Sequence, residues 1–150
     1  MKHELTYTWS ELKGVQDRMA EIERLTGEMS DTCSRKRRSM TEPERLTYNA
    51  LWKERHTLDS KCEDMRKHCI PEVGMPCTVI WYSDRSGGYV AEVVGPKKKE
   101  VIVKCDGLYH CTKVFTYRTN GHWVEKGTTS RDWGTLLHLG YKSDYYDPSF

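Results

Sequence analysis

The side chains most suggestive of binding chemistry flank the dipeptide Asn120-Gly121, which favours a two-residue β-hairpin turn. Such a turn would place Arg118 opposite Trp123, and Phe115 opposite Lys126. A cation next to an aromatic ring suits a ligand that carries both a base and a phosphate. Cross-strand aromatic pairs also stabilise sheets without any ligand, so the sequence leaves both roles open.

Arg85 is a second candidate, because it lies in a turn predicted over residues 84–88, directly after a predicted strand. A guanidinium group at the end of a rigid strand can bind a phosphate or a carboxylate through two parallel hydrogen bonds. The alternative is a local pair with Asp84 on a solvated turn.

Catalytic and metal-binding patterns are missing from the sequence. The histidines are scattered, and we find no nucleophile elbow and no glycine-rich phosphate loop. The six cysteines include no Cys-x-x-Cys pair, and His110 next to Cys111 would point to the opposite face of a strand. We therefore predict a binding protein with no catalytic residues, no metal and no cofactor.

Composition places these candidates in a small α+β protein. The chain has 150 residues, of which 37% are hydrophobic and 31% charged, with a net charge of +2. Its modest apolar content would make oligomerisation favourable. No run of about 18 apolar residues exists, so we expect no membrane span. The amino terminus has no apolar signal region, so we expect the cysteines to stay reduced.

The first half has the pattern of an antiparallel helical hairpin. We predict one helix from Glu11, capped by Ser10, and a second that starts with the capping box Thr41 and Glu44 and ends before Pro71. The exposed basic residues 35–38 lie between them. The predicted seams comprise Leu12, Val15, Met19, Ile22, Leu25 and Met29 in the first helix, and Leu51, Leu58 and Met65, widened by Leu46, Tyr48, Trp52, Cys62 and Cys69, in the second.

The second half has the alternating pattern of short strands joined by tight turns. We predict a small antiparallel β-barrel or a strongly bent sheet. Accordingly, residues 1–70 are predicted to form an oligomerisation hairpin and residues 71–150 a ligand-binding β core. A carboxy-terminal run rich in tyrosine, from Gly140 to Phe150, is predicted to dock on this barrel or on a partner subunit. The predicted strands span residues 76–83, 89–94, 100–105, 114–119, 122–126 and 135–139.

Several motifs in residues 74–150 resemble the phage Thoeris anti-defence sponge family, type one. These motifs are Tyr82-Ser83-Asp84-Arg85, Val114-Phe115-Thr116-Tyr117-Arg118-Thr119-Asn120-Gly121-His122-Trp123-Val124, Leu139-Gly140-Tyr141, and Tyr145-Tyr146-Asp147-Pro148-Ser149-Phe150. The resemblance implies a phage-encoded protein of the host cell cytoplasm that sequesters a cyclic nucleotide immune signal without cleaving it. That signal would be a cyclic ADP-ribose isomer or a cyclic oligonucleotide.

The resemblance also implies a set of ligand contacts and an assembly. Phe115 would stack on a base, and Trp123 is also predicted to contact the ligand. Family members form dimers that assemble further to hexamers, with ligand pockets at subunit interfaces. The phosphate-binding residues would be Arg85, Arg118 and Lys142, and the residues that hydrogen-bond the ribose or base edges would be Asn120 and Tyr141.

Two other functions fit the same sequence. One is a nucleic-acid-binding adaptor with an SH3-like or OB-like barrel, although the resemblance implies a small nucleotide as partner instead of a nucleic acid. Contacts to many phosphates would give that adaptor a steep salt dependence. The other is a protein inhibitor that docks through its helical hairpin.

Overall fold

The computed structural model describes residues 4–81, 84–107, 110–127 and 135–146. The chain forms two compact units, one of residues 13–64 and the other of residues 1–12 together with 65–150. The expected boundary lay at residue 70, but both ends of the helical region group with the barrel. The two ends are joined to each other, because Tyr7 and Cys69 form a parallel bridge, supported by the bond from the Ile70 N–H to the Tyr7 carbonyl at 2.7 Å. The Tyr117 hydroxyl of β4 donates a hydrogen bond to the Lys67 carbonyl at 2.9 Å and so connects them to the barrel.

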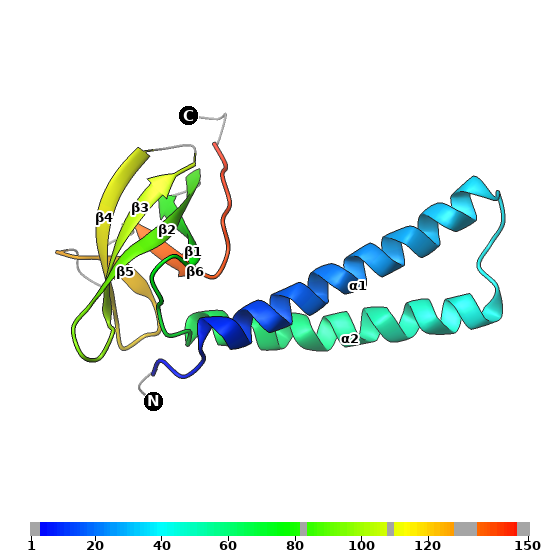
Figure 1. Ribbon diagram of the computed structural model, residues 1–150, viewed down its shortest axis with the longest axis horizontal. Coiled ribbons are helices and arrows are strands. Elements are labelled where there is room, and N and C mark those ends of the chain that lie inside the picture. The colour runs from blue at the N-terminus through cyan, green and yellow to red at the C-terminus, as the bar shows by residue number, and fades with distance from the viewer. Residues whose placement is uncertain (1–3, 82–83, 108–109, 128–134, 147–150) are drawn as a thin grey trace. The chain divides into compact units, whose positions relative to one another are not determined.

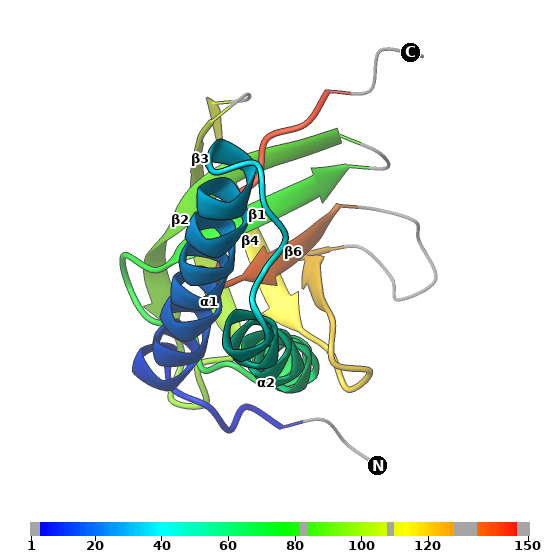
Figure 2. The ribbon, with the colours of Figure 1, turned by 90° about the vertical axis from the view of Figure 1, so that its right-hand side faces the viewer.

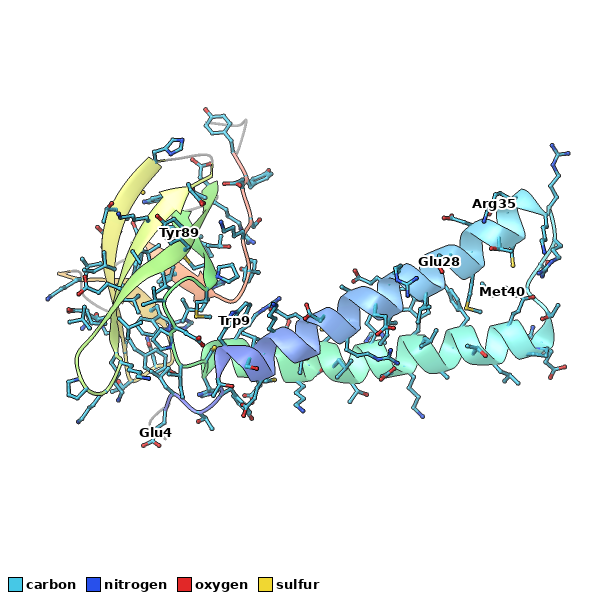
Figure 3. The ribbon with its side chains drawn as sticks, in the orientation of Figure 1. Glu4, Trp9, Glu28, Arg35, Met40 and Tyr89 are labelled. Carbon is cyan, nitrogen blue, oxygen red and sulfur yellow. The ribbon has the colours of Figure 1, made fainter. Side chains whose placement is uncertain are left out.

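The helical unit is an antiparallel hairpin of α1 (Trp9–Arg35) and α2 (Glu42–Lys67) (Figure 1). Two hydrogen bonds from Arg18 to Glu54, of 3.1 and 2.8 Å, join the helices, and Arg55 contacts Glu23. Arg35 and Met40 lie at the tip, where the chain reverses (Figure 3). Ile22 is fully buried in the seam.

The first helix begins earlier than the sequence predicts. Thr8, not Ser10, supplies the cap: its Oγ1 accepts a hydrogen bond from the Glu11 N–H at 3.2 Å. The Glu11 carboxylate accepts one from the Thr8 N–H, also at 3.2 Å. Ser10 lies inside the first turn, so the prediction that it caps the helix is wrong. A reciprocal pair satisfies two backbone donors, which a single serine cannot do.

The start of the second helix is confirmed. The Glu44 carboxylate accepts a bond from the Thr41 N–H at 3.1 Å, and Thr41 Oγ1 accepts one from the Glu44 N–H at 3.4 Å. The predicted wide apolar face is not all buried, since Leu46 and Trp52 are 64% and 37% exposed. The helix ends at Lys67, before the predicted stop at Pro71.

In the described residues the rest of the chain forms a closed antiparallel barrel in which each strand pairs with the next and the last pairs with the first (Figure 2). The α+β fold with a helical hairpin and a small barrel is thus confirmed. Its strands are β1 (Pro76–Trp81), β2 (Asp84–Val94), β3 (Glu100–Asp106), β4 (His110–Tyr117), β5 (Trp123–Glu125) and β6 (Leu136–Leu139).

The barrel interior follows the alternation of the strands. Inward-facing residues are the most deeply buried, as expected when one face of each strand lines the core. The fully buried members include Cys77, Val79, Val90, Val101, Val103 and Phe115.

The predicted turn at residues 84–88 is instead the start of β2, so that prediction is wrong. Gly88 in this part of β2 allows the main chain of β3 to approach closely. A Cβ atom added at Gly88 would lie 2.4 Å from the Lys104 carbonyl oxygen of β3. Glycine in a strand can mark such a contact as well as a turn, and the sequence alone does not separate the two.

The Asn120-Gly121 hairpin exists, but its register differs by one residue from the prediction. Gly121 has a positive φ of 85°, and its N–H bonds the Arg118 carbonyl at 3.0 Å. The loop is therefore a three-residue turn with a glycine bulge. Tyr117 pairs with Trp123 and Phe115 with Glu125. A shift of one residue reverses the face of every partner, so the predicted Arg118–Trp123 and Phe115–Lys126 pairs are wrong.

Candidate functional site

The C-terminal segment, residues 140–146, docks on the barrel beside β1 and β2, where Figure 1 shows it in red. Thr78 Oγ1 donates a hydrogen bond to the Tyr141 carbonyl at 2.7 Å. Farther along, Arg85 and Tyr145 exchange two main-chain hydrogen bonds of 2.8 and 2.9 Å. The segment therefore adds a short antiparallel bridge to the free start of β2.

Two glycines make room for the C-terminal segment. The Asp144 carboxylate accepts a hydrogen bond from the Gly87 N–H at 2.9 Å. A Cβ atom at Gly107 would lie only 2.0 Å from the same carboxylate, and one at Gly87 would lie 3.2 Å from the Lys142 Cβ. Any side chain at Gly107 would displace Asp144. The C-terminal segment therefore packs directly on the main chain of Gly87 and Gly107.

Arg85 and Tyr145 form a cation and an aromatic ring side by side. They are direct partners in an antiparallel bridge, and such partners project from the same face. Tyr145 is 51% exposed and Arg85 is also exposed. Within the described part of the chain, neither an ion pair nor a hydrogen bond engages the Arg85 guanidinium group.

Arg85 and His138 project from the same outer face of the barrel. Arg85 pairs with Ile80 and His138 with Thr78, both on β1. Thr78 and Ile80 are two positions apart, so they share a face, and their partners share it too. This places β2 and β6 residues on either side of β1.

Tyr141 joins this face to the end of α2. Its hydroxyl lies 2.7 Å from His138 Nδ1, and the two rings are 6.0 Å apart. The Arg66 guanidinium lies over the Tyr141 ring, 4.6 Å from its centroid. Such an arrangement is a cation–π contact, so the tyrosine orients both a histidine and an arginine.

We call Arg66, Arg85, His122 and His138 the basic patch. Burial lowers the pKa of His138 below its ordinary value, and the neighbouring charges of Arg85, His122 and Arg66 lower it further. Like charges this close disfavour protonation of the imidazole. A bound anion would relieve that repulsion.

Of the predicted ligand residues, the structure brings Arg85 and Tyr141 to this face. Lys142 is nearby in sequence but pairs with Asp106, at 3.1 Å. Asn120 Oδ1 accepts a hydrogen bond from the His122 N–H at 3.1 Å and so organises the turn that carries His122. Arg118 is half-buried at that turn. Tyr82, Ser83 and residues 147–150 of the quoted motifs lie outside the described residues.

Phe115 and Trp123 are not part of this face. Phe115 is 0% exposed and Trp123 is 4% exposed. The Trp123 ring packs against Tyr117, with centroids 5.2 Å apart. These rings fill the barrel, and a base could reach Phe115 only if the barrel opened.

Sequence reasoning missed Arg66, His122, His138 and Tyr145 as individual contacts. The first three lie in α2, in a turn and in β6, and no short motif links them. Two of them carried a signal, because Tyr145 belongs to the tyrosine-rich carboxy-terminal run and His122 to a motif that carries the family resemblance. The pairing of Tyr145 with Arg85 depends on how that run docks.

Among the described residues, no group of three or more histidine, cysteine and acidic side chains is placed to hold a metal ion. No described helix combines the length and the apolar character that crossing a membrane requires.

No family model matches the chain, and no curated protein or solved structure matches it significantly.

Proposed function

We propose that this protein binds a phosphate-bearing cyclic nucleotide on the outer face of β6, β1 and β2 and holds it without cleaving it. This is the sequestration that the resemblance to the phage Thoeris anti-defence sponge family implies. The observation that carries the proposal is the Arg85–Tyr145 bridge, which pairs an exposed arginine with an exposed aromatic residue. Tyr145 thus takes the stacking role first expected of Phe115.

The energetics are sufficient if several contacts act together. Nanomolar binding requires about −12 kcal/mol. Stacking of a base on an aromatic side chain contributes roughly 1–3 kcal/mol, and each charged hydrogen bond to a phosphate about 1.5–3 kcal/mol. Tyr145 and Tyr141 supply rings, while Arg85 and Arg66 supply guanidinium groups. Because main-chain bonds hold the C-terminal segment in place, less ordering is required on binding.

A small ligand fits the charge distribution better than a long polyanion does. The chain has a net charge of only +2, which is small for a protein that binds a long polyanion. Its lysine-rich turn at residues 97–99 lies in the connection between β2 and β3, and none of these lysines is among the proposed ligand contacts. In the proposed function a further copy of the chain completes the pocket, with dimers and hexamers as the resemblance implies. The protein would act inside the host cell cytoplasm.

A thermal-shift screen of the full chain against cyclic ADP-ribose isomers and cyclic di- and trinucleotides tests the proposal. A ligand at 100 times its Kd should add about 2.7 kcal/mol of stability. Arg85→Ala should abolish the shift. Arg24→Ala is the matched control, since Arg24 is an exposed arginine that pairs with Glu28 within α1.

Three results would count against the proposal. The first is that no nucleotide raises the melting temperature. The second is a cleaved product in the recovered ligand. The third is a steep salt dependence with single-stranded DNA or RNA as the tightest ligand, which would support the nucleic-acid adaptor instead.

A further inference from the structure

Two thiols face each other across neighbouring strands of the barrel. Cys105 on β3 and Cys111 on β4 are direct cross-strand partners. Their Sγ atoms are 3.0 Å apart, with Cys111 donating to Cys105, and both cysteines are free thiols. The two residues are six positions apart in the sequence.

Their backbone positions suit a covalent link. Residues directly opposite each other in an antiparallel pair have Cα atoms about 4.5–5.5 Å apart. Disulfides span Cα separations of about 4.4–6.8 Å. A bond between Cys105 and Cys111 would therefore need little change in the strands.

The two thiols differ in access to solvent. Cys111 is partly exposed, whereas Cys105 is 5% exposed. Burial raises the pKa of Cys105 to about 12, and its hydrogen bond with Cys111 adds to that effect. Because the thiolate is the attacking species, Cys111 is the thiol that meets an external reagent first. Cys105 is placed to react with it afterwards.

The other thiols lack this arrangement. Cys77 is fully buried, and burial raises its pKa to about 12. Cys33, Cys62 and Cys69 are also buried. For none of these four do the described residues place a cysteine as its cross-strand partner.

We propose that Cys105 and Cys111 form a redox modification site that low-molecular-weight disulfides, such as oxidised glutathione, convert to an intramolecular disulfide. The Cys111 thiolate attacks one sulfur of the glutathione disulfide and expels the first glutathione thiolate. Cys105 then loses its proton to solvent, attacks the Cys111 sulfur and expels the second glutathione thiolate. The protein dithiol is oxidised, and one glutathione disulfide is reduced to two thiols.

The bond would fix β3 to β4 directly before Asp106 and Gly107. Asp106 pairs with Lys142, and Gly107 lies against Asp144. Both contacts hold the C-terminal segment. The oxidised protein should therefore melt at a higher temperature than the reduced protein.

Incubation of the full chain with oxidised glutathione, followed by intact-mass and peptide analysis, tests this inference. The parent chain should lose two hydrogens, with the link mapped to Cys105 and Cys111. Cys105→Ser should accumulate a stable glutathione adduct on Cys111, because no thiol resolves it. Cys33→Ser, which removes a buried thiol of α1, should behave like the parent.

Peptide mapping of the parent chain decides the matter even if a variant fails to fold. A parent chain that stays fully reduced, or that carries only glutathione adducts, would overturn the inference. So would a Cys105→Ser chain that still loses two hydrogens. Reduction by dithiothreitol should restore the original mass and melting temperature.

Discussion

Arg85 and Tyr145 are joined by two main-chain hydrogen bonds, although one residue lies near the start of β2 and the other in the C-terminal segment, about 60 positions later. Their side chains emerge on one face, next to the His138–Tyr141 pair. The bridge depends on backbone atoms, so either side chain can be changed without removing it. Substitutions at Arg85 and Tyr145 therefore test the ligand contacts of the side chains without breaking the bridge that holds the segment.

Replacing Tyr145 should weaken nucleotide binding without unfolding the barrel. Tyr145→Ala removes an exposed ring and should cost roughly 1–3 kcal/mol of binding free energy, which is the value of base stacking. Tyr145→Phe keeps the ring and should retain most of the affinity. Isothermal titration of the two variants checks this. Equal loss in both would show that the hydroxyl, not the ring, makes the contact.

A methyl group at Gly107 should loosen the C-terminal segment. In Gly107→Ala the new Cβ would meet the Asp144 carboxylate, whose nearest oxygen, Oδ1, would lie 2.0 Å away. Because Asp144 is at the end of a side chain, it can move and release the Gly87 N–H while the barrel stays folded. The loss of that charged hydrogen bond, about 1.5–3 kcal/mol, should lower nucleotide affinity by at least tenfold.

Gly27→Ala is the matched control for the methyl group. Gly27 lies within α1, and a Cβ atom there would have no neighbour within 4 Å. Alanine in a helix interior stabilises by roughly 0.5–1 kcal/mol relative to glycine, so stability should rise and affinity should not change. If Gly107→Ala binds nucleotide as tightly as the parent, the position of the C-terminal segment does not contribute to binding.

His138 should make both stability and binding depend on pH. Its pKa is lowered from 6.5 by burial and by the charges of Arg85, His122 and Arg66. As pH falls below about 6.5, the unfolded chain takes up a proton first, so the free energy of unfolding decreases. The decrease should stop once pH passes the lowered pKa of the folded state.

An anionic ligand should reverse part of this effect. A phosphate on the basic patch raises the pKa of His138, so binding takes up a proton and the affinity should increase as pH falls. Titration calorimetry in buffers of different ionisation enthalpy measures the proton uptake. His138→Asn should flatten both pH profiles. Unchanged proton uptake in that variant would place the titrating group elsewhere.

Phe115 should matter for stability, not for binding. The ring is fully buried, and Phe115→Ala should cost about 3–5 kcal/mol through lost burial and a cavity. Phe115→Leu fills most of that volume, so the folded variant should bind nucleotide like the parent. Urea unfolding and titration calorimetry check the two parts. A large affinity loss in folded Phe115→Leu would restore Phe115 as a direct contact.

Local chemistry explains what the sequence determined. The Thr41–Glu44 capping box involves neighbouring residues only, and it is present at the start of α2. Alternation of apolar residues determined the strands and the α+β class, because a strand buries every second side chain whatever its partner. The existence of the Asn120-Gly121 hairpin was determined in the same way.

Only the tertiary structure decided which side chains meet. The bulge at Gly121 shifted the β4–β5 register by one residue. Phe115 lies opposite the buried Val101 of β3 and faces the core. The sequence predicts Gly88 in a turn, but Gly88 lies in β2, where the nearby Lys104 carbonyl leaves no room for a side chain. Arg66, Arg85, His138 and Tyr145 belong to separate elements, and their meeting depends on barrel closure and on the docking of the C-terminal segment. Those are long-range events, and no local pattern encodes them.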